Sequence, residues 1–119
     1  MSKLISGDEL QNLLNQNFQN SKKEIIIISA FITEPAVNQF IKVIPTNVHV
    51  KLVCRLKPLD AANGSCSIPA LKKVIENNWL TFRLENLHAK IYSIDNSKIY
   101  SGSANATGHG RSTLNQRRT

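Results

Sequence analysis

The stretch that decides the fold reads LHAKIYSIDNSKIYSGSAN and occupies residues 87–105. Apolar and polar side chains alternate through residues 89–94, polar residues 95–97 interrupt the pattern, and an extended pattern resumes at residues 98–101. Alternation of this kind is typical of half-buried strands, and a short polar interruption between two strands is typical of a turn. The stretch therefore predicts a β-hairpin.

Side chains two positions apart share a face of a strand, so His88 and Lys90 are predicted to point in the same direction. A two-residue turn at residues 96–97 would place Lys90 opposite Ser103 and His88 opposite Asn105. A three-residue loop would instead shift the register by one residue. In the first arrangement one face of the hairpin carries all four side chains.

A group of His, Lys, Ser and Asn suits a phosphate diester. Lysine supplies positive charge, serine and asparagine donate hydrogen bonds to the non-bridging oxygens, and histidine can attack phosphorus or transfer a proton. A His-x-Lys pair alone on a half-exposed strand is usually an ordinary pair of surface residues. The prediction of a catalytic site therefore depends on the Gly-Ser-x-Asn that follows the His-x-Lys pair.

The complete string resembles the H-x-K-(x)4-D-(x)6-G-S-x-N motif of the phospholipase D superfamily, in its nuclease-like, single-motif branch. Every motif position is filled, by His88, Lys90, Asp95, Gly102, Ser103 and Asn105. The resemblance covers about residues 24–107. It implies an α/β domain whose mixed β-sheet is flanked by helices. It also implies a metal-independent phosphodiesterase that works through a phosphohistidine, with no cofactor.

The resemblance assigns catalysis to His88, Lys90 and Asn105, and phosphate binding to Lys90 and Asn105 with Ser103 as a lesser donor. Arg55 ends an earlier predicted strand and could also reach a phosphate. In-line displacement needs groups on both sides of phosphorus, and in the family two H-x-K motifs supply them. Because this chain carries one complete motif, we expect a homodimer with a shared active site.

Asp95 and Gly102 are expected to be mainly structural, since Asp95 begins the turn. Family members usually carry an acidic residue beyond Gly-Ser-x-Asn that orients the histidine, and this chain has no acid after Asp95. Three alternatives follow: an earlier acid such as Asp60 or Glu85 substitutes, the domain is C-terminally abridged, or catalysis is impaired.

Length and charge indicate one domain, residues 1–119, with a polyanionic partner. The net charge is +7, and the residues after Asp95 add only positive charge, at Lys98, Arg111, Arg117 and Arg118. We expect residues 106–119 to be a basic, disordered tail without a strand, and nucleic acid to be the partner, DNA favoured over RNA. No apolar run could span a bilayer and no secretory signal is visible, so a cytoplasmic protein without a membrane partner is expected.

The remaining elements follow from periodicity and capping signals. We expect helices at residues 6–18, 33–44 and 67–77, strands at residues 24–31, 48–56 and 80–84, and a loop at residues 57–66. The isoleucine-rich run at residues 25–28 predicts a central strand buried on both faces. A second H-x-K at His49 and Lys51 lacks the rest of the motif, so His49 is expected to be an ordinary strand histidine.

Three functions are compatible with these features. The first is a nuclease, in the manner of a restriction-type cleavage domain. The second is a phospholipid phosphodiesterase, which an amphipathic membrane-binding element would favour and for which none is visible. The third is a catalytically silent nucleic-acid-binding module, which the missing acid favours. The sequence favours the nuclease.

Overall fold

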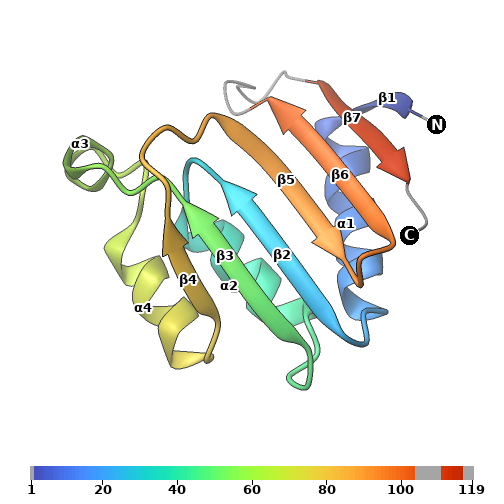
Figure 1. Cartoon of the computed structure of the whole chain (residues 1–119), viewed down its shortest axis with the longest axis horizontal. Helices are drawn as coiled ribbons and strands as arrows, with labels where there is room; N and C mark the ends of the chain where they lie inside the picture. Colours follow the sequence, from blue (N-terminus) through green and yellow to red (C-terminus); the bar gives the residue numbers. More distant parts are fainter. Residues whose placement is uncertain (1, 104–110, 117–119) are drawn as a thin grey trace.

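The computed structural model describes the backbone of residues 2–103 and 111–116 and the side chains of residues 9–101. A mixed sheet of seven strands, in the order β1-β7-β6-β5-β2-β3-β4, forms the centre of the molecule (Figure 1). The strands are β1 (Ser2–Ser6), β2 (Glu24–Ser29), β3 (His49–Cys54), β4 (Leu80–Arg83), β5 (Ala89–Ile94), β6 (Lys98–Ser103) and β7 (Arg111–Gln116). The helices are α1 (Gly7–Gln19), α2 (Glu34–Val43), α3 (Pro58–Ala62) and α4 (Ile68–Glu76).

The direction of the strands brings distant parts of the sequence to one edge. β2, β3 and β4 run parallel, whereas β5 runs antiparallel to β2, and β6, β7 and β1 continue the antiparallel pattern. The amino end of β5 therefore meets the ends of β2, β3, β4 and β6, as the arrowheads in Figure 1 show. We call the side of the sheet where β2, β3, β4 and β6 end the carboxyl edge and the opposite side the amino edge. Both names refer to the ends of strands and not to the outermost strands β1 and β4.

Helices α1, α2 and α4 lie against one face of the sheet in Figure 1, which we call the helix face. Ile25 and Ile27 point to this face and are completely buried, whereas Ile26 and Ile28 point to the other, open face and are only half-buried. The prediction of a strand buried on both faces was therefore wrong. The isoleucine run reflects the preference of β-branched side chains for strands, not two-sided burial.

Aromatic side chains from three elements form the centre of the core. Phe18 of α1, Phe40 of α2 and Tyr92 of β5 make edge-to-face contacts, with ring centroids 5.4, 6.0 and 6.2 Å apart. Such contacts favour one relative placement of the helices and the sheet. Burial raises the pKa of Tyr92 to about 12. The core thus fixes β5, which carries the motif, against two helices.

The predicted mixed sheet with its helices is confirmed, and most predicted elements agree with the structure within a few residues. The predicted loop at residues 57–66 contains a short helix, α3, because Pro58 stands at a first helical position and Asp60 in the first turn. The expectation that no strand would form after residue 106 was wrong for residues 111–116. This segment, β7, pairs with both β6 and β1, a tertiary contact that its polar sequence does not signal.

Candidate active site

The H-x-K pair lies at the carboxyl edge, at the beginning of β5. His88 is exposed and directly precedes the strand, and Lys90 is half-buried within it. Lys90 lies between Ser29 at the end of β2 and Gly102 near the end of β6. It shares the helix face with the buried Tyr92 but lies nearer the edge. The edge therefore gathers His88, Lys90 and the Gly-Ser of the motif on neighbouring strands.

The register of the hairpin differs from the predicted one. Ile94 pairs with Lys98, and Asp95 and Asn96 take left-handed backbone conformations, with φ of 53° and 56°. The turn therefore contains three residues, and Ser97 closes it by donating its N–H to the Ile94 carbonyl at 3.1 Å. Asp and Asn tolerate this conformation better than most residues, which favours the longer turn.

This shift changes which residues face each other across the hairpin. Lys90 is opposite Gly102, and Ser103 is opposite Ala89, so the predicted pairing of Lys90 with Ser103 was wrong. Asn105, predicted to lie opposite His88, is outside the described residues. The structure therefore brings His88, Lys90, Gly102 and the backbone of Ser103 together.

Asp95 lies at the amino edge, at the opposite end of β5 from His88. Its carboxylate accepts hydrogen bonds from the backbone N–H groups of Lys22, Lys23 and Glu24 at 3.0, 2.8 and 3.0 Å. Burial alone would raise the pKa of Asp95, but these three donors outweigh it and hold the pKa below its usual range. Asp95 thus fastens the hairpin turn to the connection between α1 and β2 and lies away from the H-x-K pair.

Arg55, predicted to bind phosphate, is engaged by a buried carboxylate. Its Nε and Nη2 donate to Asp60 at 2.9 and 2.7 Å, and its guanidinium lies 4.8 Å from the centroid of the Phe31 ring. Asp60 is 3% exposed and also accepts the N–H of Lys57 at 3.0 Å. The hydrogen bonds from Arg55 lower the pKa of Asp60 to about 2. The charge of Arg55 is therefore compensated, and its side chain fastens α3 to the end of β3.

The two acids considered as partners for His88 are both occupied by arginines. Asp60 pairs with Arg55, and Glu85 pairs with Arg83. Within residues 9–101, the structure pairs no carboxylate with His88. In the same range neither Lys57 nor Lys90 forms an ion pair, although the charge of Lys57 also helps to lower the pKa of Asp60.

Sequence reasoning missed the Arg55–Asp60 pair, although a signal for it exists. The run Lys57-Pro58-Leu59-Asp60 has proline at a first helical position and an acid three residues after the cap, which is typical of a helix start. A helix there would have placed Asp60 close to the strand end that carries Arg55. The buried thiols of Cys54 and Cys66 lie in the same region.

The second H-x-K lies away from the first. His49 begins β3 and pairs with Glu24, so both are at the amino edge. Lys51 forms an ion pair with Glu24 at 3.3 Å. His49 is exposed and belongs to no group of motif residues, as the sequence predicts for an ordinary strand histidine.

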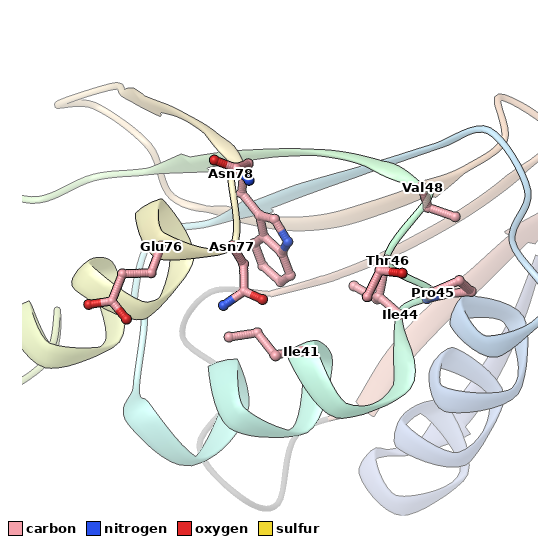
Figure 2. Close-up of a pocket in the computed structure, with 9 residues that line it drawn as sticks. Ile41, Ile44, Pro45, Thr46, Val48, Glu76, Asn77 and Asn78 are labelled. Carbon is pink, nitrogen blue, oxygen red and sulfur yellow. The ribbon is translucent and has the colours of Figure 1, made fainter.

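The described pocket is also at the amino edge. It has a volume of about 220 Å³ and lies where α2 and α4 end and β3 begins (Figure 2). Ile41 and Asn77 face each other across it in Figure 2, and Trp79 also lines it. It shares no residue with the carboxyl edge, so the motif residues lie at an exposed edge and not in this pocket.

Two further features concern metal ions and membranes. Within the described residues, no three His, Cys, Asp or Glu side chains gather closely enough to hold a metal ion. No helix in that part of the chain is long and apolar enough to cross a membrane.

Comparison with known proteins agrees with this geometry. A family model described as "Cardiolipin synthase, PLD-like domain", in which PLD denotes phospholipase D, matches residues 14–116. No curated protein matches the sequence significantly.

Solved structures share the fold at low sequence identity. Nuc from Salmonella typhimurium, a phospholipase D family member, is 14% identical with a TM-score of 0.72, over 98% of this chain and 84% of its own. NucT from Helicobacter pylori is 14% identical with a TM-score of 0.64, over 96% of this chain and 82% of its own. The archaeal DNA-binding chromatin protein TrmBL2 is 13% identical with a TM-score of 0.67, and this chain, matched over 98% of its length, spans 44% of TrmBL2.

Proposed function

Since the chain belongs to the family of phospholipase D-like domains, we propose that it is a metal-independent nuclease that cleaves phosphodiester bonds of DNA through a phosphohistidine. One observation carries the proposal. The strands β5 and β6 bring the H-x-K pair and the Gly-Ser of a complete motif to the carboxyl edge, where strand ends of α/β sheets commonly carry active sites. The lysines near this edge supply positive charge for a phosphate.

The reaction divides into two displacements. In the first, His88 attacks phosphorus, the bond from phosphorus to the leaving oxygen breaks, and that oxygen takes a proton from a second histidine. In the second, this histidine removes a proton from water, whose oxygen attacks phosphorus and releases His88. Lys90 and Asn105 hold the non-bridging oxygens throughout, with Ser103 as a lesser donor.

The second histidine is His88 of another copy of the chain. One histidine cannot stand on both sides of phosphorus in an in-line displacement, and the sequence contains one complete motif. A two-fold axis at the carboxyl edge would bring two motifs together, which makes the active species a homodimer with one shared centre. The exposed position of His88 leaves it accessible to such a partner.

Nucleic acid is the substrate that the charge of the chain favours. The net charge of +7 attracts polyanions. Among the structural neighbours, Nuc is described as a phospholipase D family member and TrmBL2 as an archaeal chromatin protein that binds DNA. We therefore favour DNA over RNA.

The test is incubation of plasmid DNA, and separately of RNA, with the purified protein in EDTA. We expect nicking of the plasmid in EDTA by the wild type and none by His88→Ala. His49→Ala is the matched control, because His49 is an exposed histidine at the other end of the sheet and should keep full activity. Activity that disappears in EDTA and returns with magnesium would overturn the proposed mechanism.

A second function is a nucleic-acid-binding module without catalysis. It is favoured by the engagement of both Asp60 and Glu85 with arginines, which leaves His88 without an acid partner in the described side chains. This alternative predicts salt-dependent DNA binding that His88→Ala leaves unchanged, with no cleavage by the wild type under any condition.

A further inference from the structure

The edge strand β4 exposes an apolar row on the open face. Leu80, Phe82 and Leu84 are 57%, 50% and 53% exposed. Leu80 and Phe82 pair in register with Lys51 and Val53 of β3, which places them on the open face. Edge strands are usually protected by lysine, proline or a covering segment, and every residue of β4 is exposed.

The backbone of β4 leaves peptide groups that point away from the sheet. Leu84 donates its N–H to the Cys54 carbonyl at 2.9 Å, so residue 84 directs its backbone toward β3. Because successive residues of a strand direct their peptide groups to opposite sides, Phe82 also faces β3, and Thr81 and Arg83 face outward. In the described sheet β4 has a neighbour on one side only.

We propose that β4 is a contact surface for a second copy of this chain, paired antiparallel about a two-fold axis at Phe82. Thr81 then exchanges backbone hydrogen bonds with Arg83 of the partner subunit. Phe82 lies opposite Phe82 of the partner subunit, and Leu80 lies opposite Leu84 of the partner subunit. The two sheets become one continuous sheet, with a connected apolar row across the axis.

The pattern of the strand selects this register. Residues whose peptide groups face away from β3 must pair with residues of the partner subunit that also face away from β3. The register between the two strands can therefore change only in steps of two residues. One such shift places Arg83 opposite Arg83 of the partner subunit, which is unfavourable for like charges. The opposite shift pairs Thr81 with itself and leaves Leu84 without an apolar partner. The register centred on Phe82 alone pairs every apolar side chain with another.

Backbone chemistry and charge both point to a copy of the chain. A row of unpaired N–H and C=O groups is satisfied by hydrogen bonds to another β-strand, and a nucleic acid has no such strand. The charges beside β4 cancel, because Arg83 pairs with Glu85. Two chains of net charge +7 therefore approach here with little local repulsion. This contact is separate from the proposed active site. Because the two copies of β4 run antiparallel, the carboxyl edge of one subunit lies beside the amino edge of the other.

Disulfide trapping tests the register. In this antiparallel arrangement position 82 forms a non-hydrogen-bonded pair with its symmetry mate, whose Cα atoms lie about 4.5 Å apart, a separation that a disulfide can bridge. We expect Phe82→Cys to form a covalent dimer under mild oxidation. Thr81→Cys and Leu59→Cys should not, although Leu59 is 71% exposed. The native Cys54 and Cys66 are buried, at 2% and 0% exposure. Absence of the Phe82→Cys dimer, or equally rapid trapping at Thr81→Cys, would overturn the register.

Sedimentation velocity tests the contact itself. Phe82→Glu should weaken self-association at least about tenfold, whereas Leu59→Glu, with its exposed leucine on α3, should leave it unchanged. Circular dichroism establishes that both variants are folded. If Phe82→Glu sediments like the wild type, the β4 contact is overturned, while a shared active site stands. If the wild type is monomeric at about 100 µM, both contacts are overturned.

Discussion

At the carboxyl edge, Lys90 is a cation that forms no ion pair within residues 9–101. Arg55 is nearby in the fold, but its charge is compensated by the buried Asp60. Lys90 lies in the central part of the sheet, one strand from Ser29 and one from Gly102, so its backbone is held on both sides. A lysine fixed in this way can hold a phosphate oxygen in one position, which is how a preorganised cation stabilises a transition state.

We therefore expect Lys90→Ala to lower kcat about a hundredfold, the usual effect of removing one donor from a charged transition state. Arg117→Ala should mainly raise Kd and make the negative slope of log binding constant against log salt shallower by about 0.9, as expected if one phosphate contact is lost. Turnover of plasmid DNA and binding at several salt concentrations are the measurements.

The control for the first change is Lys51→Ala. Lys51 is a half-buried strand lysine at the amino edge, paired with Glu24, and its loss should change neither kcat nor the salt slope much. Equal effects of the changes at Lys90, Arg117 and Lys51 on kcat would contradict the assignment of Lys90.

At the scale of elements, α3 is attached to the end of β3 by the Arg55–Asp60 pair. The pKa of Asp60 is lowered to about 2 in the folded protein by the hydrogen bonds from Arg55, against about 3.9 in an unfolded chain. A lowered folded pKa stabilises the fold above the unfolded value, and this contribution is lost as the pH falls through the folded value.

We therefore expect part of the free energy of unfolding to disappear between roughly pH 4 and pH 2. Asp60→Asn should be less stable than the wild type near pH 7, because Arg55 loses its ionic partner, and should lose less stability over the acid range. Urea unfolding at a series of pH values measures both. Parallel pH profiles for the two proteins would refute the role of the pair. Asp95, whose pKa is also lowered, supplies an acid-sensitive contribution that Asp60→Asn leaves intact.

The elements that the sequence predicts well are those with strong local periodicity. The isoleucine run of β2 and the apolar stripe that includes Phe18 are local patterns, and both elements form where predicted. β7 is different, since its sequence is polar and its order comes from pairing with β6 and β1. No local signal distinguishes such a strand from a tail.

The motif indicates which side chains to look for at the carboxyl edge, but not how they are arranged there. His88, Lys90 and Gly102 meet as the motif indicates, yet one extra turn residue changes every pairing across the hairpin. Left-handed conformations at Asp95 and Asn96 decide between the two turns, and Asp95 is held there by N–H groups of residues 22–24, distant in sequence. A tertiary contact of this kind cannot be derived from the hairpin alone.

For the whole molecule, the two proposed contacts use different parts of the sheet. The shared active site needs a two-fold axis at the carboxyl edge, and the β4 contact needs one at the side of the sheet. A chain with two separate isologous contacts builds assemblies larger than a dimer. Measuring activity and mass in the same samples therefore separates the contribution of each contact.

The shared centre makes a specific prediction for mixed subunits. Wild-type and His88→Ala chains, mixed in equal amounts, unfolded and refolded together, should pair at random at the carboxyl edge. About a quarter of the shared centres then contain two histidines, so activity should fall to about a quarter of that of unmixed wild type at the same total concentration. Independent centres would instead keep about a half.

A parallel mixture with His49→Ala is the control for refolding. His49 lies at the amino edge, so this mixture should keep the full activity of the wild type. The β4 contact does not disturb the count, because pairing at each carboxyl edge remains statistical whatever is joined through β4. A retained activity of about a half, or a fully active monomer in light scattering, would refute the shared centre and require that one His88 serve without a partner.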